Sequence, residues 1–369
     1  MNKMIGSEFF LDRYEPLEDK EIKLDFLDLN IKDSVFISSI RNAVSLILDQ
    51  NRFSDEAKLV LLPSFTSSII VDQFLKGGYK VFYHVINKDL TFNRKLFLED
   101  IERIRPSVVL IHGYFGFDSL DNIKDLIKNI RSSGVLVIED MTQSLYSKIE
   151  HSHADYYIFD FKLWTALPDG AGLISSQKSF SFKPFALDIS LEEKRLEAMH
   201  TKYLYINGDI DVKKEFVNLF CEAENLLLNH KNIYAMSPRS ILIQANLDIN
   251  FLRDARRANY KTLYRALVDS ELVEPIFGEL EEGVVPLCFP LYAKCNRDQL
   301  KDYLEARCIY LPILWPRPSS LEDKGDETSQ WIYENILTIP CDQRYIDRDM
   351  DRIVKVIKDY ETSATSDKL

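Results

Sequence analysis

The sequence lacks several features that would assign its class directly. None of its apolar runs approaches the roughly 20 residues that a membrane-spanning helix needs. The N-terminal stretch MNKMIGSEFFLDRYEP has no apolar core of the kind found in signal peptides. Five cysteines make an odd count and include no CxxC pair. We therefore expect a cytoplasmic chain with reduced thiols and no membrane partner.

Histidine and positive charge are also scarce. The six histidines include one close pair, His151 and His153, which is too little for a metal site. The formal net charge of −12 argues against a nucleic-acid partner, because such partners normally need a basic face. An anionic small ligand stays possible, since a local nest of backbone N–H groups can hold a phosphate on an acidic protein.

In the first half of the chain, apolar runs alternate with amphipathic stretches. This alternation predicts a mostly parallel sheet with helices on both faces, whose ligands bind beyond the carboxyl ends of the strands. The expected strands cover 58–65, 80–86, 107–115, 135–140, 155–161 and 171–176, and the expected helices cover 38–51, 65–78 and 119–134.

The second half has a different pattern. Residues 188–232 are expected to be helical, followed by helices over 251–270, 297–308 and 349–361 and a strand over 284–293. This mixture predicts a smaller α+β domain. We therefore divide the chain into a large α/β domain, residues 1–235, and a small C-terminal α+β domain, residues 236–369.

Polar groups follow several of the expected strands. VIEDMTQSL ends a strand at Asp140, with Gln143 three residues later. A buried carboxylate there can hold a proton on a basic ring nitrogen, or it can simply cap the turn that follows. LLPSFTSS leads through Phe65 and Thr66 into a helix start suited to an anion, and Phe65 is placed to stack on a planar ring.

Taken in order, these motifs resemble the DegT/DnrJ/StrS-type nucleotide-sugar aminotransferases, which are fold type I pyridoxal-phosphate enzymes. The resemblance covers nearly the whole chain. It rests on GSEF, VLLPSFT, IHGYFG, VIEDMTQSL, PDGAG, RRANY, ILWPRP and IPCDQRY. It implies a fold type I transferase architecture, a homodimer and pyridoxal 5′-phosphate as cofactor.

The resemblance also implies roles for individual residues. Asp140 would face the pyridine nitrogen of the cofactor, which makes the ring an electron sink, and Gln143 would lie near its phenolic oxygen. Ser38, Ser39 and Arg41 correspond to the turn that holds the phosphate, so all these residues are candidate cofactor ligands together with Phe65, Thr66 and Asp160.

The stretch YYIFDFKLWTALPDG, residues 156–170, departs from the family pattern S-x-R-K-W followed by P-D-G-G. A gap-free match on Trp164 puts Asp160 at the phosphate-binding serine, Lys162 at the arginine and Leu163 at the Schiff-base lysine. Ile40 also replaces a small glycine in the phosphate turn. A carboxylate ~4 Å from a phosphate costs on the order of a few kcal/mol.

Lys162 is therefore either a Schiff-base nucleophile in a shifted register or a structural or substrate-contacting lysine. A shift requires the backbone to have turned, because successive strand residues point to opposite faces. Two further pairs of readings concern arginines. Arg253, Arg256 and Arg257 form either the solvated face of a helix, which we favour, or a substrate clamp. Asp342 and Arg344 form either a local salt bridge, which we favour, or a pair of catalysts.

Three functions follow from these residues. The first is a pyridoxal-phosphate-dependent aminotransferase of sugar or polysaccharide biosynthesis, which transfers an amino group from an amino acid to a nucleotide-linked keto-sugar with Lys162 as the catalytic amine. The second is a homologue without the lysine, which acts as a binding or regulatory dimer. The third is an enzyme that uses its cofactor non-covalently.

Overall fold

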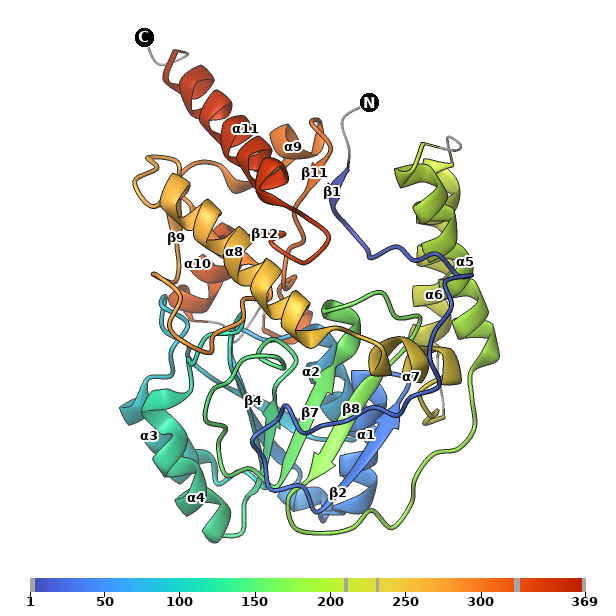
Figure 1. Cartoon of the computed structure of the whole chain (residues 1–369). Helices are drawn as coiled ribbons and strands as arrows, with labels where there is room; N and C mark the ends of the chain where they lie inside the picture. Colours follow the sequence, from blue (N-terminus) through green and yellow to red (C-terminus); the bar gives the residue numbers. More distant parts are fainter. Residues whose placement is uncertain (1–3, 209–211, 230–231, 322–325, 367–369) are drawn as a thin grey trace.

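The computed structural model describes residues 4–208, 212–229, 232–321 and 326–366 of the 369. Its centre is a seven-stranded sheet in the order β2-β8-β7-β6-β5-β3-β4 (Figure 1). β8 runs antiparallel to both β2 and β7, and the other neighbours are parallel. The sheet consists of β2 (Asp33–Ile37), β3 (Leu59–Pro63), β4 (Lys80–His84), β5 (Val108–His112), β6 (Leu136–Asp140), β7 (Tyr156–Asp160) and β8 (Ala171–Ser175). The six strands expected from the sequence and the mostly parallel sheet are confirmed.

Helices cover both faces of this sheet, as the apolar composition of its strands predicts. Alternate strand residues belong to two separate cores. Val60, Leu110 and Ile158 pack with α1 (Ile40–Gln50) and α2 (Ser68–Lys76), whereas Leu61 and Val109 pack with α3 (Arg94–Ile104) and α4 (Lys124–Ser132). The side chains of Ser39, Ser67 and Asn93 cap the first three helices. The β2 strand and α3 were not anticipated.

A helical hairpin extends from the sheet and forms one side of the molecule in Figure 1. It consists of α5 (Ile189–Ile206) and α6 (Lys213–Leu228), which pack on each other through Leu191, Ala223 and Leu227. The helical segment expected over 188–232 is thus two helices, with 209–211 and 230–231 outside the described residues. α7 (Pro238–Ala245) and α8 (Ile249–Leu267) follow.

The C-terminal part builds a second, antiparallel sheet in the order β12-β10-β9. Its strands are β9 (Val273–Pro275), β10 (Phe289–Ala293) and β12 (Ile336–Ile339), and its helices are α9 (Arg297–Glu305), α10 (Glu327–Asn335) and α11 (Asp347–Ser366). Single turns of 3-10 helix are η1 (Asp55–Ala57), η2 (Asp121–Ile123), η3 (Phe161–Leu163) and η4 (Ser319–Leu321). The division at residue 235 stays a prediction.

The N-terminal segment crosses to this C-terminal part. β1 (Ile5–Gly6) pairs in parallel with β11 (Ile309–Tyr310). Gly6 has a φ of 84°, and a Cβ atom there would lie 1.9 Å from the carbonyl oxygen of Tyr310. A residue without a side chain is therefore needed for this close approach.

Arg256 of α8 joins the two parts of the chain. Its side chain is fully buried, so the expectation of a solvated face is wrong at this position. Nη1 donates to the carbonyl oxygen of Leu287 at 2.6 Å, and Nη2 donates to that of Trp164 at 3.2 Å. The guanidinium also lies over the Trp164 ring at 4.6 Å. Arg256 thus connects the turn after β7 to the strand region before β10.

We expect Arg256→Met to lower the free energy of unfolding by about 3 kcal/mol or more, because several buried carbonyl oxygens lose their donor. Urea unfolding measures the change. The control Arg265→Ala, at an exposed position of the same helix, should change the free energy by less than about 0.5 kcal/mol. Equal effects of the two substitutions would contradict the assignment.

Candidate ligand-binding site at the carboxyl ends of the central strands

The register of the sheet brings several predicted site residues to one edge. Asp140, the last residue of β6, pairs with His112 of β5 and Ile158 of β7. Ala171 of β8 pairs with Asp160 on one side and with Ile37 on the other. Ser38, which follows Ile37, and Asp160 therefore lie at the same end of the two strands that flank β8, where parallel sheets place their ligands.

Asp140 lies at this edge with little access to water. Its side chain accepts a hydrogen bond from the backbone N–H of Thr142 at 2.8 Å, so it caps the turn that follows β6. Burial raises the pKa of Asp140 to about 6, and the charges of Asp160 and Glu139 act in the same direction, whereas the hydrogen bonds from Thr142 oppose the shift. Asp140 is thus a carboxyl group whose ionised form has too few partners in the protein.

Gln143 lies in the same turn and has an unused donor. Its Oε1 accepts the backbone N–H of Phe115 at 2.8 Å, while its Nε2 is buried and has no hydrogen-bond partner. An orphaned donor in a buried side chain is costly unless a ligand or water accepts from it. Asp140 and Gln143 thus each keep a polar group that the protein leaves unsatisfied, and both lie at the carboxyl end of β6.

Lys162 does not lie in a strand. β7 ends at Asp160, whose Oδ1 accepts the backbone N–H of Lys162 at 2.8 Å and starts the turn η3. The Nζ of Lys162 lies 3.4 Å from the other carboxylate oxygen of Asp160. Because the chain has already turned, Lys162 and Leu163 both line the same cavity. The backbone turn that Lys162 needs in order to replace the family lysine at position 163 is therefore present, but its ammonium is paired with Asp160.

This cavity has a volume of about 270 Å³ and lies between η3, the N-terminal segment and the C-terminal part. Charged and apolar groups share its wall: Gly6, Ser7, Glu8, Phe9, Lys162, Leu163, Arg256, Leu287, Cys288, Pro312, Leu314, Pro340, Asp342 and Arg344. Arg344 and Asp342 form the expected salt bridge, with Nε and Nη2 contacting the two carboxylate oxygens at 2.7 and 2.8 Å. Lys162 is therefore the cation of this wall that lies beside the strand ends.

The residues expected to hold a phosphate are engaged inside the protein. Ser39 caps α1 through the backbone N–H of Asn42 at 3.4 Å, and Ser38 Oγ accepts from Asn42 Nδ2 at 2.8 Å. The guanidinium of Arg41 contacts Glu224 of α6 at 3.1 Å. The role of Glu224 was not anticipated, because one acidic residue on an amphipathic helix carries no signal in the sequence.

Phe65 and Thr66 lie in a different environment. The Phe65 ring packs against Tyr114, Trp315 and Tyr333, with ring centroids 5.5, 5.6 and 5.0 Å away. The hydroxyl of Tyr333 accepts the backbone N–H of Thr66 at 2.9 Å. Both residues are buried in aromatic packing, and their proposed contact with a cofactor remains a prediction.

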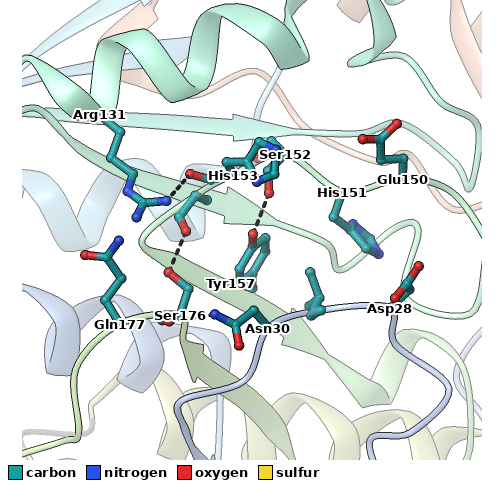
Figure 2. Close-up of a pocket in the computed structure, with 12 residues that line it drawn as sticks. Asp28, Asn30, Arg131, Glu150, His151, Ser152, His153, Tyr157, Ser176 and Gln177 are labelled. Carbon is teal, nitrogen blue, oxygen red and sulfur yellow. Dashed lines mark hydrogen bonds between the residues drawn. The ribbon is translucent and has the colours of Figure 1, made fainter.

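Glu139, next to Asp140, points to the opposite face of the sheet, as alternation along a strand requires. Its Oε1 lies 2.8 Å from Nδ1 of His151, and its Oε2 accepts the backbone N–H of Ser152 at 2.8 Å. His151 borders a separate hollow of about 340 Å³ together with Arg131 (Figure 2). Among the described residues, no group of three or more potential ligands is placed to hold a metal ion.

These observations decide how well pyridoxal 5′-phosphate fits. The residues expected to face the pyridine ring fit it, because Asp140 can pair with the ring nitrogen and the orphaned Nε2 of Gln143 can donate to the phenolic oxygen. The phosphate side does not fit, because the carboxylates of Asp160 and Glu224 already pair with Lys162 and Arg41. A dianion beside two carboxylates is repelled. Pyridoxal 5′-phosphate as a whole therefore does not fit the residues of this site.

No protein-family model and no curated protein sequence matches the chain. Solved structures do. PseC of Helicobacter pylori, an aminotransferase involved in the biosynthesis of pseudoaminic acid, has a TM-score of 0.67 at 14% identity, covering 97% of this chain and 98% of that chain. DesV of S. venezuelae, solved in complex with a ketimine intermediate, has a TM-score of 0.65 at 15% identity, covering 91% and 87%. A DegT DnrJ EryC1 StrS aminotransferase from Brucella abortus has a TM-score of 0.63 at 17% identity, covering 93% and 91%.

At these identities the similarity establishes the shared fold. The expected fold type I transferase architecture, with a mostly parallel sheet flanked by helices, is confirmed. In the part of the chain that the structure describes, no helix combines the length and apolar composition needed to cross a membrane.

We expect Asp140→Asn to stabilise the protein at pH 8 and to have little effect at pH 4. The pKa of about 6 in the folded state lies above the ordinary value of 3.8, so the folded state binds the proton more tightly. The stability that protonated Asp140 contributes is fully present below pH 4 and is lost as the pH rises through 6. The loss amounts to about 3 kcal/mol in total. Asparagine cannot ionise and escapes this loss.

Urea unfolding of the wild type and the variant at pH 4 and pH 8 measures the difference. The exposed Asp359→Asn serves as the control and should change stability equally little at both pH values. A wild type that is as stable as Asp140→Asn at pH 8 would show that Asp140 has a partner that stabilises its charge.

Proposed function

We propose that this chain is an aminotransferase-like protein of sugar or polysaccharide biosynthesis that binds its ligand beside Lys162 without forming a Schiff base. The observation that carries the proposal is the pairing of Lys162 Nζ with Asp160 at 3.4 Å, next to Leu163 at the position of the family lysine. An amine held in an ion pair with a carboxylate is a poor nucleophile. In this proposal the chain is a binding or regulatory protein of the cytoplasm.

The ligand class follows from the cavity and from the neighbours. Pockets that enclose a drug-sized ligand measure ~300–1,000 Å³, so about 270 Å³ suits a single sugar ring better than a whole nucleotide. Glu8 and Lys162 offer an acceptor and a donor for hydroxyl groups on this wall. A nucleotide-linked keto-sugar, with its nucleotide outside the cavity, is consistent with similar structures that include sugar aminotransferases.

A second candidate is transamination through Lys162, with an amino acid as donor. It is favoured by one observation: η3 turns the backbone so that Lys162 lines the same cavity as Leu163. In that case Lys162 would have to leave Asp160 and lose its proton to attack a carbonyl group.

The homodimer implied by the family resemblance has a candidate surface where residues 182–189 lead into the hairpin. Phe182, Phe185, Leu187 and Ile189 precede or begin α5 and are 50, 85, 39 and 59% exposed. Leu228, at the end of α6, is 51% exposed. A cluster of large exposed apolar side chains is typical of a protein contact. A second copy of the chain is the occupant we propose.

Titration with pyridoxal 5′-phosphate separates the two functions. For the binding protein we expect no absorbing aldimine at Lys162, and after borohydride reduction the peptide that contains Lys162 should have an unchanged mass. Lys162→Ala should give the same spectrum as the wild type. A reduced adduct on Lys162 that is absent from Lys162→Ala would overturn the binding function and support transamination through Lys162.

The dimer is tested by Phe185→Glu. A charge at the most exposed aromatic residue of this surface should convert a dimer into a monomer, which light scattering after size exclusion measures. Phe251→Glu, at a position of α8 that is 58% exposed, is the matched control and should stay dimeric. A wild-type monomer, or a dimer that survives Phe185→Glu, would remove this surface as the interface.

A further inference from the structure

Two arginines contact one carboxylate where α6 meets the start of α1, and the charge of Lys162 acts on the same carboxylate. Arg41 Nη2 lies 3.1 Å from Oε1 of Glu224, and Arg195 Nη2 of α5 lies 2.8 Å from Oε2. Burial would raise the pKa of Glu224, but the charges of Lys162, Arg195 and Arg41 outweigh it and lower the pKa. We call these four residues the Glu224 cluster.

The cluster lies where the protein is suited to an external anion. Arg41 belongs to the first turn of α1, whose N–H groups carry the positive end of the helix dipole. Arg195 is 8% exposed, and its Nε is buried without a hydrogen-bond partner. This orphaned donor indicates that one carboxylate does not satisfy the guanidinium groups around it.

Solvent reaches the cluster from one side. Ser39 and Arg41 also line a hollow of about 310 Å³ along α1, and the side chain of Glu224 is 42% exposed. An anion from solution can therefore compete with Glu224 for Arg41. The cost of adding a phosphate is its repulsion from Glu224 and Asp160, on the order of a few kcal/mol at short range.

We propose that Glu224 is an internal substitute for a bound phosphate and determines ligand specificity: it neutralises the subsite at the start of α1, so that the chain selects ligands that carry no phosphate there. Asp160 acts in the same direction through Lys162. Two carboxylates against three cations leave one positive charge, which is insufficient for a dianion. The inference rests on the proposed function for the location of the site.

The test uses pyridoxamine and pyridoxamine 5′-phosphate, which share one ring and differ by the phosphate. For the wild type, isothermal titration should give dissociation constants within about threefold of each other, or no binding of either probe. Glu224→Gln keeps the size of the side chain and removes its charge. In Glu224→Gln with Asp160→Ser, the phosphorylated probe should bind at least about tenfold more tightly than pyridoxamine.

Glu222→Gln is the matched control. Glu222 lies on the same helix and pairs with Lys194 of α5 at 3.0 Å, so it repeats the link between the helices outside the cluster. It should leave the ratio of the two constants at the wild-type value. Thermal melting of each variant verifies that it is folded.

Two results would overturn the proposal: a wild type that already prefers the phosphorylated probe tenfold, or a folded double variant without that preference. Neither result depends on a Schiff base, because pyridoxamine carries an amine where pyridoxal carries the aldehyde. Failure of this inference is therefore distinguishable from failure of the proposed function, which the borohydride experiment reads at Lys162.

Discussion

The arrangement of the site depends on the carboxylate of Asp160. One of its oxygens accepts the backbone N–H of Lys162 and ends β7, and the other lies 3.4 Å from the ammonium of the same residue. The same group therefore starts the backbone turn and forms an ion pair with the amine that the turn presents. A serine at this position could make the first contact but not the second, since it carries no charge. Changing Asp160 thus alters the backbone turn and the ion pair of Lys162 together.

The two halves of the site differ in how well the protein satisfies them. Around Asp140 and Gln143, a buried carboxyl with a raised pKa and an unused amide donor remain. Around Arg41, by contrast, the carboxylate of Glu224 supplies most of the missing charge. Unsatisfied polar groups reduce stability and tend to be found where a ligand completes them. The ring side thus keeps the properties of a binding site, while the phosphate side has those of a structural contact.

The sequence predicted the strands of the central sheet because continuous apolar runs are a local signal. It also placed Asp140 at the carboxyl end of a strand, where ligands bind in such sheets. The position of Ser38 at the same end depends on β2, which was not anticipated. The sequence could not predict Glu224, whose partner Arg41 is 183 positions away. Arg256 was misjudged for the same reason: helical spacing does not reveal that backbone carbonyl oxygens from distant turns converge on one guanidinium. Contacts that depend on packing between elements leave no trace in the local pattern.

The pairing of β1 with β11 has a consequence for how the protein reaches its final form. The cavity wall combines Gly6 to Phe9 with residues as late as Arg344. A ribosome adds the second group long after the first, so β1 has no strand partner until β11 has been made. Closing so long a loop is slow compared with forming the local helices. The wall of this cavity is therefore complete only after the last of these residues has been added and the two ends of the chain have met.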